Sequence, residues 1–529
     1  MSCKVKKYLG GPGTGKTFTL LNELDSFLNK GYKYSDICFI TFQRATAKEV
    51  REKIKLKFNN INKGDLYLYS TQHSICYKLL KIKRNQVVSP DDRFKLCKKY
   101  LIEYLKPKKS AEILIESTNA EGNKIFSLFD RLRSEGNSVT RKTLILSLIE
   151  DEIQTNVDRI YNLWKDYLIY KRINDKLDFV DMLQSVIVRK LFPPVKILLV
   201  DEFQDFGELQ YKVFEFWKSK MEYVTVVGDD DQSIFGFMGN SPKYLINLEG
   251  ETIVLKENRR NPHNIYEFAK KIISKNKLRE QKQIVCLKNG GKVERVDGYT
   301  FLSKTLKEIK NNANKKFILA RTNYYCRKIT DVFLEEGVPF RYMRNDKSPY
   351  TPKFKNIFSV FYKIKKKTNI NPSEIKEFIL SLKSKGLLIR GVKKQLKEGI
   401  MDLEEPMPFV NWATKFFSIN CYGLTLLDFL KKTRLESRIQ KGILRDAIKL
   451  NKLYEIKTID NFIGTFHSSK GLEASEVYIF DTLPSKVSRS LKFNKHIEAE
   501  RRLYYTALTR TTQKEVLIHN FFDGDNFLR

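Results

Sequence analysis

Near the N-terminus the sequence reads Gly10-Gly11-Pro12-Gly13-Thr14-Gly15-Lys16-Thr17, directly after a short apolar run that ends at Tyr8-Leu9. Glycines lower the steric cost of a loop whose backbone N–H groups wrap around phosphate oxygens. A lysine at this spacing reaches the β- and γ-phosphates, and the next hydroxyl ligates Mg²⁺. The residues after the loop have the pattern of a helix whose positive N-terminal end faces the phosphates. The stretch therefore predicts a loop that binds a nucleoside triphosphate, with Lys16 on the phosphates and Thr17 on Mg²⁺.

The charge balance of the chain indicates its class of partner. Its 529 residues include 97 lysines and arginines against 62 aspartates and glutamates, a formal net charge of +35. Such an excess repels itself unless a polyanion uses it, which indicates nucleic acid, although a bias toward Lys, Asn and Ile accounts for part of the charge. There is no apolar run near 18 residues, no signal-peptide pattern and no CxxC pair among the seven cysteines. We therefore expect a soluble intracellular protein, in the cytoplasm or nucleus, without a membrane partner.

Short apolar and β-branched runs recur along the chain, and stretches with helical periodicity separate them. This rhythm is typical of buried parallel strands in doubly wound α/β sheets. Two Lys-rich intervals, residues 81–170 and 351–451, break it with long helical periodicity. The expected strands cover Ile37–Thr41, Leu66–Tyr69, Ile197–Val200, Val224–Val227, Phe317–Ala320, Val477–Phe480 and Val516–Ile518.

A second group of chemically capable residues follows the apolar run Leu198–Val200. Asp201 and Glu202 would lie at the carboxyl edge of a parallel sheet, where ligands of open α/β sheets bind. Asp201 can hold the Mg²⁺ that Thr17 ligates, and Glu202 can orient and deprotonate the attacking water. Carboxylates at strand ends also occur as simple caps, but the phosphate-binding loop in the same chain favours the catalytic interpretation.

A third group follows the next apolar run, in the stretch Gly228–Gly239. Gln232 is a neutral group that can sense a γ-phosphate. Phe235 and Phe237 lie two residues apart and offer flat faces on which bases of any identity can stack. On this stretch alone, the alternative is that both rings belong to the hydrophobic core.

Taken in order, these motifs resemble the series of superfamily one DNA helicases of the UvrD/Rep/PcrA branch, over nearly the whole chain. Several motifs in the expected order are far more specific than any one of them. The series consists of the phosphate-binding loop, Ile40–Glu49, Ser70–Ser74, Leu177–Leu183, Asp201–Asp205, Gly228–Ser233, Leu255–Asn261, Gly464–Glu473 and Glu498–Arg510.

The resemblance implies two RecA-like P-loop NTPase cores of the α/β class, with ATP and Mg²⁺ between them, each core carrying a mainly helical insertion. The first core would comprise residues 1–80 and 171–255, with its insertion at 81–170. The second would comprise residues 256–350 and 452–529, with its insertion at 351–451. The implied partners are single-stranded DNA and duplex junctions, bound by a monomer or a weak oligomer.

The resemblance also implies roles for residues far apart in the chain. Arg260 and Arg510 resemble arginine fingers that stabilise charge on the transferring phosphoryl group, and Lys16, Asp201, Glu202 and Gln232 complete the catalytic set. Arg259 and Glu473 would contact the base and the ribose of the nucleotide. The implied single-strand path contains Phe42, Thr71, His73, Phe235, Phe237, Asn323 and His467.

The chain departs from the family pattern at three places. Nine residues precede Gly10, so we expect that it lacks the upstream segment with which members recognise adenine. Arg259 stands where an aromatic residue usually stacks on the base, although a guanidinium plane can stack too. Met238 stands where an arginine is usual. The first two departures leave the base specificity of the nucleotide open.

Three functions follow from this interpretation. The favoured one is an ATP-dependent DNA helicase that moves 3′ to 5′, with the polarity implied by the family alone. The second is a translocase that strips proteins from single strands without separating duplexes, and the third is a binding protein with a degenerate nucleotide site. RNA is an alternative substrate, because stacking and phosphate contacts tolerate both sugars.

Overall fold

A computed structural model of the chain describes residues 3–42, 44–57, 64–106, 120–150, 155–336, 338–343, 356, 359–360, 363–364, 367–382, 387–399, 405–417 and 460–528. The chain divides into two compact units. Unit 1 contains Met1–Lys292 and Arg489–Gln513, and unit 2 contains Val293–Ser488 and Lys514–Arg529. Among the described helices, none has the length and the apolar character needed to cross a membrane.

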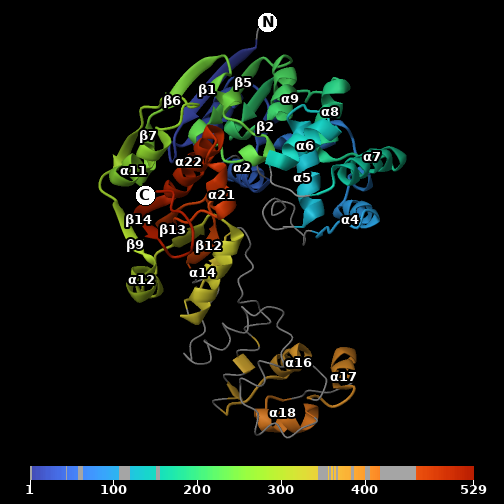
Figure 1. The fold of residues 1–529 in the computed structure, drawn as a ribbon, viewed down its shortest axis with the longest axis vertical. Helices are drawn as coiled ribbons and strands as arrows, with labels where there is room; N and C mark the ends of the chain where they lie inside the picture. Colours follow the sequence, from blue (N-terminus) through green and yellow to red (C-terminus); the bar gives the residue numbers. More distant parts are fainter. Residues whose placement is uncertain are drawn as a thin grey trace. The chain divides into compact units, whose positions relative to one another are not determined.

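Unit 1 is built on a six-stranded sheet in the order β3-β2-β4-β5-β1-β6 (Figure 1). Every neighbouring pair in it is parallel. The strand β1 thus has a neighbour on each side, and the phosphate-binding loop follows its carboxyl end. The strands are β1 Lys4–Gly10, β2 Ile37–Thr41, β3 Tyr69–Thr71, β4 Ile197–Val200, β5 Tyr223–Gly228 and β6 Glu251–Leu255.

Alternating side chains of these strands face two separate hydrophobic cores, because successive residues of a strand point to opposite faces. Ile197 and Leu199 pack with Leu24 of α1 (Lys16–Asn29) and with α2 (Arg44–Lys57). Leu198 and Val200 pack on the other face in a second core, which contains four other helices. Burial on both faces explains why these strands are continuous apolar runs. The helices of the second face are α3 Gln72–Leu79, α8 Phe179–Val188, α9 Glu208–Lys218 and α10 Lys243–Ile246.

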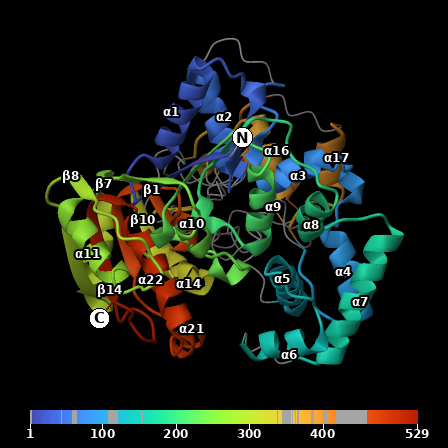
Figure 2. The ribbon, with the colours of Figure 1, turned by 90° about the horizontal axis from the view of Figure 1, so that it is seen from above.

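The first Lys-rich interval folds as helices with a core of their own. One of them, α5 (Glu121–Ser134), lies beside α8 and α9 (Figure 2). Ser89 and Asp92 cap the first of these helices reciprocally, and Asn156 caps the last. Ile125, Phe129 and Tyr167 are fully buried in this core. The helices are α4 Pro90–Lys99, α5 Glu121–Ser134, α6 Arg141–Glu150 and α7 Val157–Ile173.

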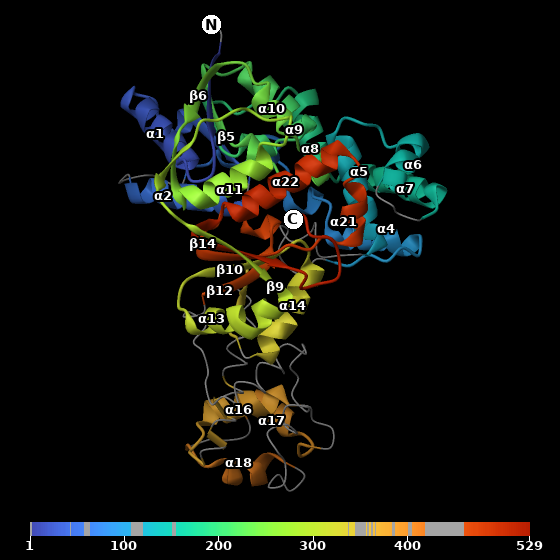
Figure 3. The same ribbon diagram turned by 60° about the vertical axis from the view of Figure 1, so that its left-hand side comes forward.

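Two segments from distant parts of the chain complete unit 1. The helices α11 (His263–Ile273) and α22 (Asn494–Leu508) pack against each other, as Figure 3 shows. A two-stranded parallel ribbon, β7 (Glu257–Pro262) and β8 (Val285–Lys288), flanks α11. Arg260 and Arg510 therefore belong to the same compact unit as the phosphate-binding loop.

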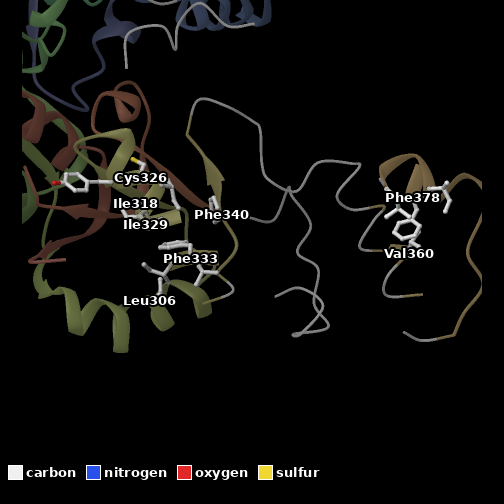
Figure 4. Close-up of a cluster of buried hydrophobic side chains, with 14 of the residues drawn as sticks. Leu306, Ile318, Cys326, Ile329, Phe333, Phe340, Val360 and Phe378 are labelled. Carbon is white, nitrogen blue, oxygen red and sulfur yellow. The ribbon is translucent and has the colours of Figure 1, made fainter. Parts of the chain in front are cut away.

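Unit 2 contains a second six-stranded sheet in the order β11-β12-β10-β13-β14-β9. Ile318 of β10 packs with Ile329 and Phe333 of α14 (Figure 4). The strands are β9 Lys292–Asp297, β10 Lys316–Ala320, β11 Arg341–Tyr342, β12 Asn461–Thr465, β13 Ala474–Phe480 and β14 Thr511–His519. The helices are α12 Gly298–Thr300, α13 Leu306–Asn311, α14 Asn323–Glu335, α16 Pro372–Ser381, α17 Val392–Glu398, α18 Phe409–Phe416 and α21 Ser485–Ser490.

The α/β class and the two parallel-sheet cores are confirmed, and all but one of the expected strands form. The exception is Leu66–Tyr69, where the backbone N–H groups of Tyr67 and Tyr69 donate to the carbonyls of Gly64 and Leu66, so a turn precedes β3. The boundaries of the four expected segments remain a prediction. Much of the interval 351–451 lies outside the described residues, including all of 418–451.

Candidate active site

The three chemical groups expected from the sequence follow adjacent strands of the sheet in unit 1. The phosphate-binding loop follows β1, Asp229 follows β5 and Asp201 follows β4, and these strands are neighbours in the order β4-β5-β1. Because parallel strands end at the same edge of a sheet, the three groups share one edge.

The loop from Gly10 to Gly15 has the backbone geometry that its glycines allow. Gly13 and Gly15 have φ angles of 69° and 80°, in the left-handed region. A Cβ atom on Gly13 would lie 2.5 Å from Cβ of Arg260. The backbone N–H of Arg259 donates to the carbonyl of Gly13 at 3.0 Å. Strand β7 therefore closes directly on the loop, and only glycine fits at position 13.

Lys16 begins α1 and turns back over the loop. Its Nζ donates to the carbonyl of Gly10 at 3.1 Å and to that of Gly11 at 2.8 Å, while the Thr14 hydroxyl also donates to Gly11. Burial lowers the pKa of Lys16, and the nearby positive charge of Arg260 lowers it further. An anion at the loop would offset both effects.

Thr17 and Asp201 lie together, as the sequence predicts for a shared Mg²⁺. The Thr17 hydroxyl donates to Oδ2 of Asp201 at 2.8 Å. A hydroxyl beside a carboxylate is a hard oxygen pair of the kind that Mg²⁺ accepts, so these residues fit that ion. Burial, followed by the charge of Glu202, raises the pKa of Asp201 to about 7. A bound divalent cation would favour the ionised form.

Glu202 occupies a left-handed backbone conformation, with φ at 54°. Such a conformation is uncommon for a residue other than glycine and is concentrated at functional sites. The Glu202 carboxylate accepts a hydrogen bond from Nε2 of Gln204, and Oε1 of Gln204 accepts one from the backbone N–H of Asp229. One amide therefore connects the candidate base to the end of β5.

Gln232 and Arg510 are in direct contact. Nη2 of Arg510 donates to Oε1 of Gln232 at 2.6 Å, and Nε2 of Gln232 donates to Oδ2 of Asp229 at 2.5 Å. Arg510 is 2% exposed. Burial, followed by the charge of Arg260, lowers the pKa of Arg510 to about 9. The structure therefore brings together Gln232 and Arg510, which are 278 positions apart in the chain.

Arg260 lies beside the loop, since a Cβ atom on Gly13 would be 2.5 Å from its own Cβ, and its charge lowers the pKa of both Lys16 and Arg510. Its backbone N–H donates to Oδ1 of Asn258 at 3.0 Å, which fixes the turn of β7 beside the loop. These positive charges suit an anion with several charges, such as a triphosphate. The carboxylates of Asp229, Glu202 and Asp201 act in the opposite sense and raise the pKa of Lys16.

The two residues expected at the base and ribose lie in different units. Arg259 is exposed in unit 1 and forms an ion pair with Glu257 at 2.7 Å. Glu473 is exposed in unit 2, between a short 3-10 turn and β13. Their contacts with a nucleotide remain a prediction.

Three of the expected single-strand residues form a row of aromatic rings in unit 1. Phe42 follows β2 and stacks on Phe235, with ring centroids 5.2 Å apart. Phe235 is 8% exposed and contacts Phe237, which is 43% exposed. The alternative interpretation of these rings as core therefore suits Phe235, whereas Phe237 presents a face to solvent.

The remaining expected contacts have local roles as well. The Thr71 hydroxyl accepts a hydrogen bond from the backbone of Ser74 and caps α3. Burial, followed by the charge of Arg44, lowers the pKa of His73 to about 4, so its ring is neutral at pH 7. In unit 2, Asn323 begins α14 and His467 is buried in the turn after β12.

Two kinds of residue at this edge were not expected from the sequence. Phe179 is 46% exposed and meets the ring of His73 edge-on at 5.8 Å. Phe179 belongs to the motif Leu177–Leu183, which was a usable signal, but no role was predicted for this residue. Lys282 and Arg279 pair with the aspartates after β5, but an isolated lysine in a Lys-rich chain carries no signal.

Comparison with known proteins agrees with the motif series. The model of the UvrD/REP helicase N-terminal domain matches residues 5–252, and that of the UvrD-like helicase C-terminal domain matches residues 344–520. The chain is 24% identical to a probable DNA helicase II homolog of Mycoplasma capricolum, over 99% of this chain and 83% of the relative. It is also 24% identical to the ATP-dependent DNA helicase Rep of Buchnera aphidicola and to PcrA of Staphylococcus epidermidis, over 96% of this chain and 89% and 80% of those relatives. The chain belongs to the UvrD/Rep family of helicases.

Proposed function

We propose that this ATP-dependent DNA helicase hydrolyses ATP at the edge of the unit 1 sheet and uses the cycle to move 3′ to 5′ along single-stranded DNA. The observation that carries the proposal is that the loop with Lys16, the Thr17–Asp201 pair and the Gln232–Arg510 pair come together at the ends of neighbouring strands. Carboxylates and an amide complete the set that phosphoryl transfer requires. The polarity is typical of the family.

Each side chain has a distinct task in the proposed reaction. Lys16 and the loop N–H groups bind the β- and γ-phosphates, and Thr17 with Asp201 would hold Mg²⁺. A bound Mg²⁺ neutralises charge on the phosphate oxygens. Glu202, oriented by Gln204, accepts a proton from the attacking water.

Arg260 and Arg510 stabilise the charge that develops on the transferring group. Arg510 already contacts Gln232, so the two residues act as a pair. A γ-phosphate competes for the Arg510 guanidinium and changes that contact. Gln232 thereby converts the state of the nucleotide into a movement of the backbone that follows it.

The backbone after Gln232 leads directly to the aromatic row of Phe235 and Phe237. Base stacking on such rings grips a strand without reading its sequence, as a tracking enzyme requires. The excess of lysines and arginines behind the net charge of +35 offers cations for contacts with the DNA phosphates. The affinity that such contacts provide falls steeply as the salt concentration rises. We propose single strands and duplex junctions as the substrates, with the protein as a monomer or a weak oligomer.

ATPase rates with single-stranded DNA, duplex DNA and RNA of equal length test the proposal, followed by unwinding of duplexes with a 3′ tail, a 5′ tail or no tail. We expect stimulation by single-stranded DNA and unwinding of the 3′-tailed duplex alone. The Lys16→Ala variant should bind single strands normally and hydrolyse no ATP.

The remaining outcomes separate the alternatives. Displacement of a protein block from a single strand without unwinding would identify a translocase. Stimulation by RNA above DNA would reassign the substrate. An ATPase that no nucleic acid stimulates would overturn the proposal.

A further inference from the structure

Three consecutive aspartates after β5 are buried together. Asp229 and Asp230 are 0% exposed and Asp231 is 1% exposed. One carboxylate oxygen of each aspartate lies within 4.8 Å of the corresponding oxygens of the other two. Three carboxylates in such an environment are unstable in the ionised form unless cations pair with them.

Lys282 supplies the central cation. Its Nζ lies 3.1 Å from Oδ1 of Asp229 and 3.0 Å from Oδ2 of Asp231, and it also donates to Oδ1 of Asp230. An ammonium has three N–H donors, so one lysine can pair with each of the three carboxylates. The Lys282 side chain is 1% exposed, and its charge therefore acts on this cluster with little screening.

Neighbours of Lys282 hold the rest of the cluster. Arg279 forms a bidentate pair with Asp231, at 2.9 and 2.8 Å. The backbone N–H of Glu280 donates to Oδ2 of Asp230 at 2.8 Å. Arg502 of α22 donates to the carbonyl of Asp230 at 3.2 Å. The short segment from Arg279 to Lys282 and the helix that precedes Arg510 thus both hold the aspartates.

Asp229 links Lys282 to the reacting site, because its two carboxylate oxygens contact different partners. Oδ1 pairs with Lys282, and Oδ2 accepts Nε2 of Gln232 at 2.5 Å. This contact turns the carbonyl end of the Gln232 amide toward Arg510. Burial alone would raise the pKa of Asp229, but the charges of Lys282 and Lys16 outweigh it and the net shift is downward. Asp229 therefore stays an acceptor, which the amide orientation requires.

We infer that Lys282 is a positioning residue for ATP hydrolysis, a cation supplied by the chain that holds the Asp229 carboxylate by Oδ1 and so fixes the Gln232 amide, bound at Oδ2, against Arg510. This inference rests on the proposed function of that site. Lys282 does not touch the reacting atoms; it acts through Asp229 and Gln232.

A double-mutant cycle tests the inference, with Lys282→Met, Gln232→Ala and the double variant compared at saturating single-stranded DNA. We expect Lys282→Met to lower kcat by about 10-fold or more, with KM for ATP changed by less than about 3-fold, because binding groups on the loop remain. Gln232→Ala should then cost less than about 2-fold in the Lys282→Met background. Equal costs of Gln232→Ala in both backgrounds would overturn the inference.

Lys171→Met is the matched control. Lys171 is a buried lysine of the same unit that pairs with Asp178 at 2.8 Å and with Asp181 at 2.6 Å, remote in sequence from the reacting residues. It should lose thermal stability as Lys282→Met does, yet keep kcat and the full cost of Gln232→Ala. An equal fall of kcat in Lys171→Met would assign the Lys282 effect to general destabilisation and overturn the inference.

Two further measurements cover a variant that folds poorly. Lys282→Met with Asp230→Asn removes one uncompensated charge and leaves the Asp229–Gln232 contact, so it should fold and still show the low kcat. In Lys282→Ala, ethylammonium should restore turnover, whereas tetramethylammonium, which has the same charge and no N–H donor, should not. Equal effects of the two ions would contradict the inference. A wild-type chain without DNA-stimulated ATPase would instead refute the proposed function, so the two failures are distinguishable.

Discussion

The hydroxyl of Thr17 donates to Oδ2 of Asp201 across 2.8 Å, which joins the first turn of α1 to the end of β4. Both groups are ligands that Mg²⁺ prefers, and burial with the neighbouring charge of Glu202 raises the pKa of Asp201 to about 7. The Asp201 carboxylate suits a metal, but in its ionised form it destabilises the metal-free fold.

This destabilisation predicts an unusual dependence of folding stability on pH. A carboxyl whose pKa is higher in the folded chain than in the unfolded chain binds protons more tightly when folded, so stability falls as the pH rises from about 4 to about 7. We expect Asp201→Asn, without nucleotide or metal, to have a higher Tm than wild type at pH 8 and a smaller advantage at pH 5, while turnover is lost. Thermal unfolding across this pH range in EDTA checks the prediction. Parallel pH profiles of the two proteins would contradict it.

Glu202→Gln should separate binding from hydrolysis. The substitution keeps the shape of the side chain and removes the base, which commonly contributes about 10² to 10⁴ in rate. We expect kcat to fall within that range, with ATP still bound and slower release of single-stranded DNA in its presence. Glu249→Gln, at an exposed position before β6, is the control. A normal turnover number in Glu202→Gln would exclude this residue as the base.

Arg510→Ala should leave nucleotide binding close to normal and abolish most hydrolysis. A guanidinium that meets the developing charge is worth about 10³ to 10⁵ in kcat, and the contact with Gln232 places Arg510 for that task. Equilibrium binding of a fluorescent ATP analogue and steady-state ATPase give the two numbers. Arg501→Ala, on the helix α22 that precedes Arg510, is the control. Weakened binding as the main defect would make Arg510 a ground-state ligand.

Phe237→Ala should weaken the grip on DNA without damage to the core, because the ring is 43% exposed. Loss of one stacked base costs about 1 to 3 kcal/mol, and we expect single-strand affinity to fall accordingly, with more ATP consumed per base pair unwound. Phe192→Ala removes an exposed ring of similar accessibility, 40%, that packs on Phe216. If both variants bind and unwind alike, Phe237 has no special role on the strand.

Several parts of the fold follow from local pattern. The loop from Gly10 to Thr17, helix α1 and the strands that precede Asp201 and Asp229 form where spacing and apolar runs predict them. Turn chemistry was the weak signal, since Leu66–Leu68 has the composition of a strand but a turn forms there, and the strand β3 begins only at Tyr69.

The sequence by itself determined which residues could bind a phosphate, a metal or a base, because those chemistries depend on side-chain type and short spacing. Only the tertiary structure decided which of them meet. Gln232 and Arg510 lie 278 positions apart, and Lys282 lies 52 positions from Asp230. Nothing local specifies these pairs: they form because buried charges must be neutralised, and because α22, which ends two residues before Arg510, packs against the turn Asp230–Gln232.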